Sequence, residues 1–183
     1  RLTKKSADQT GVFYDKSLKS MSKEKGIILY GDHAGLFCPD GGASLFYLDN
    51  MDEGKMPRNA IDLILEIVRE VQSEYPDKEL AVLAPFRDTV NAIIDRMLNF
   101  NMSFNKLEVN TVDRIQGMTV DICIYLAPSY KSKFSFDINR FNVAASRSKN
   151  GTLIIAENLL SNRKLLSTKV MSYLNNAYIT ESK

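Results

Sequence analysis

The chain has 183 residues, of which 44% are apolar and 25% are charged, as in an ordinary soluble domain with a buried core. No apolar run is long enough to span a bilayer and no signal peptide opens the sequence, so we expect a cytoplasmic protein without membrane contact. His33 is the only histidine, which excludes a His-Asp triad and a multi-histidine metal site within the chain. Cys38 and Cys123 form no CxxC pattern, so we expect free thiols in a reducing compartment.

The net charge of +2 conceals an uneven distribution. Residues 1–25 carry seven Lys/Arg and three Asp/Glu, and residues 129–183 carry nine and three. Residues 26–128, in contrast, carry eight basic and sixteen acidic residues. Two basic ends around an acidic middle favour a local anionic partner, although ordinary solvated charge explains the pattern equally well.

The first part of the chain is expected to be a polar extension or linker, residues 1–43, packed on the domain that residues 44–183 form. Residues 1–25 are polar and lysine-rich and predict loop and irregular helix. Gly26 to Tyr30 is a short apolar run that predicts a strand. The four glycines and Pro39 of residues 31–43 predict a loop.

The middle of the chain alternates between apolar runs and amphipathic segments. Apolar residues at helical spacing predict one helix around residues 61–71, ending before Pro76, and a second after Pro85. Short apolar runs predict strands at residues 45–48, 80–84, 107–112 and 120–126.

The segment from Asn139 to Glu157 is expected to form a helix, a tight cap and a buried strand. Asn150-Gly151 is interpreted as the helix stop, since glycine adopts the left-handed cap conformation cheaply. The apolar run of residues 152–156 predicts a strand covered on both faces. Residues 161–176 then predict a last helix.

Strands that alternate with helices predict an α/β fold with βαβ units and a mainly parallel sheet. Ligands of such sheets bind at the carboxyl ends of the strands. Three stretches leave strands there, namely residues 84–87, residues 111–119 and the loop that begins at Pro128. We therefore expect the chemistry of the chain in these stretches.

Arg87 and Arg147 are the two arginines whose positions call for an explanation. Arg87 stands at a predicted helix start, where the helix dipole disfavours a cation, so either a bound anion or simple solvent exposure accounts for it. Arg147 lies near a helix end, where a cation is favoured by the dipole. The alternative is an arginine aimed across a cleft at a phosphate, which a planar and permanently charged fork suits.

Three segments together resemble motifs IV, V and VI of the superfamily I helicases: LAVLAPFRDTV, VNTVDRIQGMTVDICIYL and RFNVAASRSKNGTLIIAE. The similarity is strongest to the branch that contains the nonsense-mediated-decay helicase. It covers about residues 44–160, and Arg1, a dozen residues before the Phe13-Tyr14 pair, extends it. The resemblance implies the second, C-terminal RecA-like domain of a two-domain ATP-driven motor, with a three-layer fold and no P-loop of its own.

The resemblance also implies roles for the residues that match the nucleotide motifs. Phe86 corresponds to an aromatic residue that stacks on adenine, and Arg87 to an arginine that reaches the γ-phosphate. Arg147 corresponds to the arginine finger and Arg140 to a second arginine of motif VI. On this interpretation Arg87 and Arg147 are catalytic and should lie at one edge of the sheet.

Motif V links the phosphate site to the nucleic-acid backbone in this family. Gln116 and Gly117 match its nucleotide-binding part, and Thr111 matches its nucleic-acid-binding part. Where the family often has an acidic residue near the ribose, this chain has Thr119, which leaves the nucleotide preference open.

The basic loop before the last motif is a further candidate contact for a single strand. Lys131 and Lys133 stand beside Phe134 and Phe136, which suits phosphate pairing and base stacking. Core anchoring of the two phenylalanines is an equally good interpretation.

No GxxxxGK[ST] stretch occurs, so the chain holds only part of a phosphate site. We therefore expect an ATP-dependent DNA or RNA helicase in the full protein. ATP is expected to bind between this domain and the N-terminal RecA-like domain of the same protein, with Mg²⁺ held mainly by that domain. The fragment alone is expected to be inactive. The alternative is a non-catalytic nucleic-acid-binding module of the same fold.

Overall fold

A six-stranded, all-parallel sheet is the centre of the computed structural model, which describes residues 3–14, 25–115, 117–130, 132–157 and 166–181. The strand order is β3-β2-β4-β5-β1-β6, and each neighbouring pair is parallel. The strands are β1 (Ala43–Tyr47), β2 (Leu80–Ala84), β3 (Leu107–Thr111), β4 (Val120–Ala127), β5 (Ser148–Ala156) and β6 (Tyr178–Glu181).

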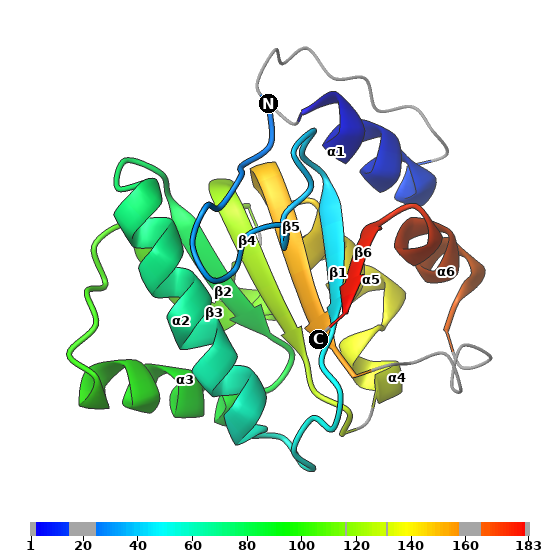
Figure 1. Cartoon of the computed structure of the whole chain (residues 1–183). Helices are drawn as coiled ribbons and strands as arrows, with labels where there is room; N and C mark the ends of the chain where they lie inside the picture. Colours follow the sequence, from blue (N-terminus) through cyan, green and yellow to red (C-terminus); the bar gives the residue numbers. More distant parts are fainter. Residues whose placement is uncertain (1–2, 15–24, 116, 131, 158–165, 182–183) are drawn as a thin grey trace.

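Helices cover both faces of this sheet (Figure 1). One apolar core contains residues of α2 and α3, and the other contains residues of α5 and α6. The predicted α/β fold of three layers is therefore confirmed. The helices are α1 (Lys4–Thr10), α2 (Arg58–Glu74), α3 (Arg87–Asn99), α4 (Ser132–Ser135), α5 (Ile138–Ala145) and α6 (Thr168–Asn175), with short 3-10 helices at Gly11–Phe13 and Val112–Arg114.

Helix α2 forms because its apolar side chains recur at helical spacing and face the core. It ends at Glu74, two residues before Pro76, which cannot extend the helical hydrogen bonding. Helix α3 starts directly after Phe86, so both helices agree with the prediction from the sequence. The buried face of α2 consists of Ala60, Ile61, Ile64, Leu65, Ile67, Val68 and Val71.

The strand predicted for Gly26 to Tyr30 is wrong. Ile27 and Leu29 are buried as a strand pattern would require, but no sheet partner lies beside the segment in the described structure. Its backbone instead forms hydrogen bonds with the side chain of Tyr75, the residue that follows α2. The Tyr75 hydroxyl accepts from Ile28 N at 3.0 Å and donates to Ile28 O at 2.8 Å. The backbone groups of the segment therefore need no neighbouring strand.

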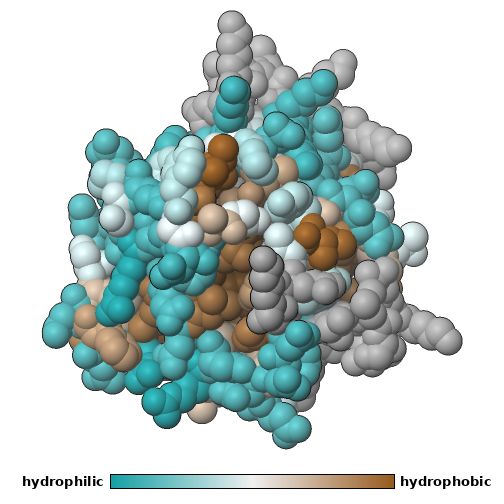
Figure 2. All heavy atoms as spheres, viewed as in Figure 1, coloured by the Kyte–Doolittle hydropathy of each residue, from teal (hydrophilic) through white to brown (hydrophobic). Residues whose placement is uncertain are grey.

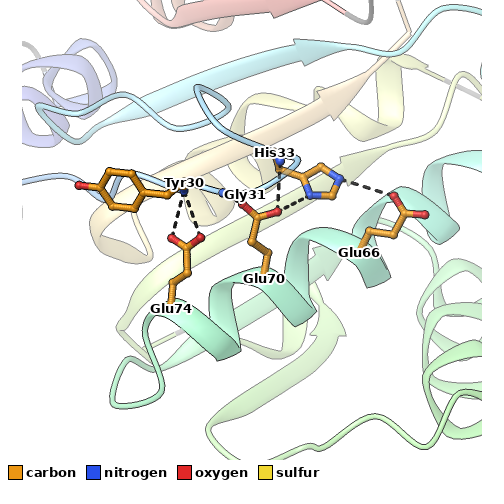
Figure 3. A network of polar contacts seen from close by, with 6 residues as sticks. All are labelled: Tyr30, Gly31, His33, Glu66, Glu70 and Glu74. Atoms are coloured by element: carbon orange, nitrogen blue, oxygen red, sulfur yellow. Dashed lines mark hydrogen bonds and ion pairs between the residues drawn. The ribbon is translucent and has the colours of Figure 1, made fainter.

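Three glutamates of α2, namely Glu66, Glu70 and Glu74, are spaced one turn apart and contact the loop of residues 30–33 (Figure 3). The Glu74 carboxylate accepts from the backbone N–H of Tyr30 at 3.1 Å. The Glu70 carboxylate accepts from the N–H groups of Gly31 and His33, and the His33 Nδ1 atom lies 2.7 Å from Glu70 Oε2. The spacing of i, i+4 and i+8 places these carboxylates on one face of α2, so the loop is held along two helical turns.

The helix stop predicted at Asn150-Gly151 is also wrong. Helix α5 ends at Ala145, and both residues lie inside β5, where Gly151 pairs with Ile122 of β4. Gly151 does not have a positive φ. The strand therefore begins four residues earlier than the apolar run of residues 152–156 indicates, because backbone pairing with β4 does not depend on apolar side chains.

The end of the chain contains a strand that the sequence did not reveal. Part of the helix predicted for residues 161–176 lies outside the described residues, and within them α6 begins after Ser167, whose hydroxyl accepts from Val170 N. Strand β6 follows and pairs with β1 at the sheet edge. Strand β6 has only four residues, and its two apolar side chains are adjacent and exposed, so it lacks the alternation of apolar and polar residues by which strands are recognised.

Helix α1 is fixed to the ends of β1 and β5. Thr3 caps it by accepting from Ser6 N, and the Thr3 N–H donates to the carbonyl of Lys149 at 3.0 Å. Gly41 and Gly42 lie under this helix with φ of 81° and 84°, and a Cβ atom on either would meet α1 or its cap within 2.5 Å. The described part of residues 1–43 is thus packed on the sheet.

Figure 2 shows the face that carries α2, where hydrophilic side chains surround apolar atoms near the centre. An extended segment, rather than a further helix, covers part of this face, through the buried Ile27, Leu29, Leu36 and Phe37. Within the described ranges, none of the helices has the length and apolar character needed to cross a bilayer.

Candidate functional site

Because all strands of the sheet run in the same direction, the ends of the strands form two distinct borders of the sheet. All first residues lie at one end, here called the amino edge, and all last residues lie at the other, the carboxyl edge. Arg147 directly precedes β5 and lies at the amino edge, whereas Arg87 follows β2 and lies at the carboxyl edge. A five-residue strand spans about 17 Å. The expectation that these two arginines share one edge is therefore wrong, because α5 runs back across the sheet before Arg147.

Arg147 is held at the amino edge by three hydrogen bonds to its own chain. Its Nε donates to the carbonyl of Val143, its Nη1 to the carbonyl of Met118 and its Nη2 to the Ser146 hydroxyl, each at 3.0 Å. In the described part of the chain, these bonds use three of the five guanidinium N–H groups. The side chain is half-buried and positioned, with donors left for an anion.

The segment that matches motif V connects the two edges. Thr111 ends β3 at the carboxyl edge, and Met118 reaches Arg147 at the amino edge. Gly117 has a φ of 92°, which favours glycine, and no atom lies within 4 Å of the position of a Cβ atom there. Gln116 lies outside the described residues, so its predicted contact stays a prediction.

A group of aromatic rings and cations gathers at the carboxyl edge, and we name it the carboxyl-edge cluster. The rings of Phe86 and Phe134 are stacked, with centroids 5.1 Å apart and an interplanar angle of 14°. The Tyr130 ring meets Phe86 edge-on at 5.7 Å. Phe86 follows β2, and the other two rings follow β4, so the cluster arises where neighbouring strands end. It consists of Lys55, Phe86, Tyr130, Phe134 and Arg140.

Two cations lie over these rings. The Arg140 Cζ atom is 4.1 Å from the centroid of Phe134, and its Nε is 3.4 Å from Asp113. The Lys55 Nζ atom is 5.9 Å from the Phe86 centroid. The hydrogen bond and ion pair with Asp88 raise the pKa of Lys55 above its ordinary value.

The start of α3 lies beside the cluster. Phe86 precedes the helix without a side-chain capping bond, and Arg87 is exposed. The Thr89 hydroxyl donates to the carbonyl of Lys55 at 2.6 Å and thereby fixes the lysine loop to α3. The structure thus places Arg87 and Lys55 around one helix start.

Of the two lysines predicted to contact nucleic acid, one lies among the described residues. Lys133 is exposed on α4, and Lys131 lies outside the described residues. Phe136 is buried in the core, whereas Phe134 belongs to the cluster. Core anchoring was therefore the right interpretation for Phe136.

Several of the residues predicted for the nucleotide thus group differently in the structure. Phe86 and Arg140 lie with Phe134 at the carboxyl edge rather than with Arg147. Sequence reasoning missed Lys55 and Tyr130 because neither stands in a motif; only the rule that ligands bind where parallel strands end points to the loops that carry them.

Comparisons with known proteins identify the family and the fold of the chain. Residues 42–159 match the model of a family described as AAA domain. Replicase polyprotein 1ab of Bat coronavirus 512/2005 is 35% identical over 91 residues, which make up 50% of this chain and 1% of that polyprotein. The corresponding polyprotein of Bat coronavirus HKU9 is 33% identical over 91 residues, with the same coverage. The chain thus spans about 1% of the length of these curated relatives.

The fold is similar to that of the C-terminal domain of a possible DNA helicase from Lactobacillus plantarum WCFS1. The TM-score is 0.60 at 10% sequence identity, and the alignment covers 98% of this chain and 97% of the other. The RecA-like fold is therefore confirmed, and the chain is similar in fold to this helicase C-terminal domain. Because the matched residues 42–159 make up more than half of its length, the chain belongs to the AAA domain family.

Proposed function

We propose that this chain is the C-terminal motor domain of an ATP-dependent superfamily I helicase, and that its amino edge faces the nucleotide. Arg147 carries the proposal, since it combines a motif VI position with a guanidinium that is pre-positioned and, among the described residues, uses only three of its five donors. In phosphoryl transfer, such an arginine stabilises the charge that spreads over the γ-phosphoryl oxygens.

In this proposal the carboxyl edge binds the nucleic acid. The carboxyl-edge cluster offers aromatic faces for bases and cations for phosphates, as single-strand-binding surfaces do. Phe86, Arg87 and Arg140 then serve the nucleic acid instead of ATP. Thr111 and Lys133 belong to the same edge, and both DNA and RNA suit these contacts.

ATP and Mg²⁺ require groups beyond this chain in the proposal. The chain offers Arg147 for the phosphates but no P-loop. Among the described residues no group of three or more His, Cys, Asp or Glu is arranged to hold a metal ion. In the proposal, a preceding motor domain of the same protein supplies the P-loop and the Mg²⁺ ligands, and the isolated chain should hydrolyse no ATP.

Replacement of the two arginines in the longer protein tests the division between the edges. Arg147→Ala should slow single-turnover ATP hydrolysis by a factor on the order of 10³, and Arg147→Lys should rescue it poorly. Arg87→Ala should instead weaken the binding of a single strand. Arg58→Ala, at an exposed position on α2, is the control. Equal losses of rate from Arg87→Ala and Arg147→Ala would contradict the assignment.

The second candidate is a nucleic-acid-binding module of this fold that has lost ATP turnover. Thr119 favours it, since it stands where the resembled family often has an acidic residue near the ribose. An assay of nucleic-acid-stimulated ATP hydrolysis by the longer protein separates the two, because only the helicase proposal requires turnover.

A further inference from the structure

A pocket of about 450 Å³ opens at the amino edge, below the first residues of three neighbouring strands. Leu80, Leu107 and Val120 form its apolar floor, and each is the first residue of its strand. Phe104 and Met118 stand exposed at its rim. The volume lies within the range of small-ligand sites, and the aromatic rim suits a flat group.

Two carboxylates and one ammonium line the pocket. Glu79 and Glu108 line it, and neither takes part in an ion pair within the described part of the chain. The side-chain amide of Asn110 donates a hydrogen bond to the Glu108 carboxylate at 2.9 Å. Lys106 also lines the pocket, but its ammonium lies 3.2 Å from the carbonyl and 3.5 Å from the carboxylate of Asp77. A flat cation with an apolar stem, which a guanidinium side chain provides, matches this combination.

One wall of the pocket is the segment that holds Arg147. Met118 lines the pocket, and its carbonyl accepts the Arg147 Nη1 hydrogen bond. Val120 also lines it, and its N–H donates to the carbonyl of Arg147 at 3.0 Å. Gly117 precedes this wall with a positive φ and open space around it. An occupant of the pocket therefore contacts the residues that orient Arg147.

We propose that this pocket is a socket for an arginine side chain of the preceding motor domain, and that its filling steadies the Met118 carbonyl by which Arg147 is already held. This inference rests on the proposed function, because it takes the amino edge as the edge that faces the nucleotide cleft. The pocket is continuous with that edge through Met118, and its unpaired carboxylates complement a cation. The socket couples cleft closure to the arginine without any contact to the nucleotide.

The first test uses the 183-residue chain and benzamidine, a flat aromatic cation. In ¹⁵N-labelled protein, benzamidine should cause saturable NMR shifts at the amides of residues 106–108 and 118–120 and at the Arg147 Nε–H. The neutral analogue benzamide should bind at least tenfold more weakly. The double variant Glu79→Gln/Glu108→Gln should weaken benzamidine binding at least tenfold, while the exposed Glu53→Gln control leaves it unchanged. Equal binding of benzamide, or shifts elsewhere, would overturn the proposal.

The second test asks whether the carboxylates of the pocket are needed for ATP hydrolysis by the longer protein. Glu79→Lys/Glu108→Lys, checked for folding by its thermal melt, should lower ATP hydrolysis at least tenfold, whereas Glu53→Lys should not. Unchanged hydrolysis by a folded charge-reversal variant would overturn the socket. The proposed function is judged separately by Arg147→Ala: loss of rate there with normal rate in the charge-reversal variant rejects the socket alone, and normal rate in Arg147→Ala rejects the motor assignment.

Discussion

The imidazole of His33 and the carboxylate of Glu70 are 2.7 Å apart, and the same carboxylate accepts two backbone N–H groups of the loop. Glu70→Ala removes all three acceptor contacts at once. We expect the free energy of unfolding to fall by about 1–3 kcal/mol, measured by urea denaturation. Glu66→Ala is the matched control: Glu66 lies 3.5 Å from His33 on the same helix face and is mostly exposed, so it should cost at most about 1 kcal/mol. Equal losses would show that the loop is not held by Glu70.

Gln9 joins two distant parts of the fold and is almost fully buried. Its Oε1 accepts from Ala43 N at 2.6 Å, and its Nε2 donates to the carbonyl of Asn176 at 2.5 Å. Gln9→Ala leaves a buried N–H at the start of β1 without its acceptor. We expect a loss of about 1–3 kcal/mol in the free energy of unfolding by chemical denaturation, whereas Asp8→Ala, exposed on the same helix, should cost almost nothing. An unchanged free energy of unfolding in Gln9→Ala would mean that water replaces the hydrogen bonds of the glutamine.

Acid should weaken the fold partly through Asp62. The hydrogen bond from Arg96 lowers the pKa of Asp62 below its ordinary value of 3.8. A depressed pKa in the folded state contributes stability that is present above the ordinary value and is lost as the pH falls through the folded value. Denaturation at a series of pH values from 6 down to about 2 should show this loss, and Asp62→Asn should flatten it. Asp95→Asn, exposed on α3, should keep the wild-type slope, and an unchanged slope for Asp62→Asn would contradict the expectation.

Binding of a single strand by the isolated chain should depend on salt through the carboxyl edge. Each cation that neutralises a phosphate contributes about 0.7 to the slope of log K against log salt. Lys55→Gln/Arg140→Gln should therefore reduce the slope by about 1.4, measured by fluorescence anisotropy with oligo(dT) and oligo(U). Lys106→Gln, at the amino edge, should leave the slope unchanged. A wild-type slope in the double variant would place the nucleic acid elsewhere.

The sequence allowed prediction of the elements whose apolar patterns are long and periodic, such as α2 and the strands on either side of α3. The prediction from the sequence failed where an apolar run does not pair in the sheet, and where residues typical of a cap do pair in it. Gly26 to Tyr30 has the apolar residues of a strand, but its hydrogen bonds go to side chains of the helix. Asn150 and Gly151 have the composition of a cap, but their backbone pairs with β4.

The candidate site shows the same limit at a larger scale. Motif resemblance located Arg147, yet it gave no means of telling at which end of the sheet a motif residue lies. That requires the direction in which each helix returns between two parallel strands. Phe86 and Arg140 stand in different motifs, and only the fold brings both to the ring of Phe134.

Helix α5 touches both edges of the sheet, with Arg140 in its first turn and Arg147 just beyond its end. Eight helical residues form a rod about 12 Å long, so the two arginines belong to opposite ends of one short element. In the proposed function, this one short helix therefore joins the side of the domain that faces the nucleotide to the side that binds the single strand.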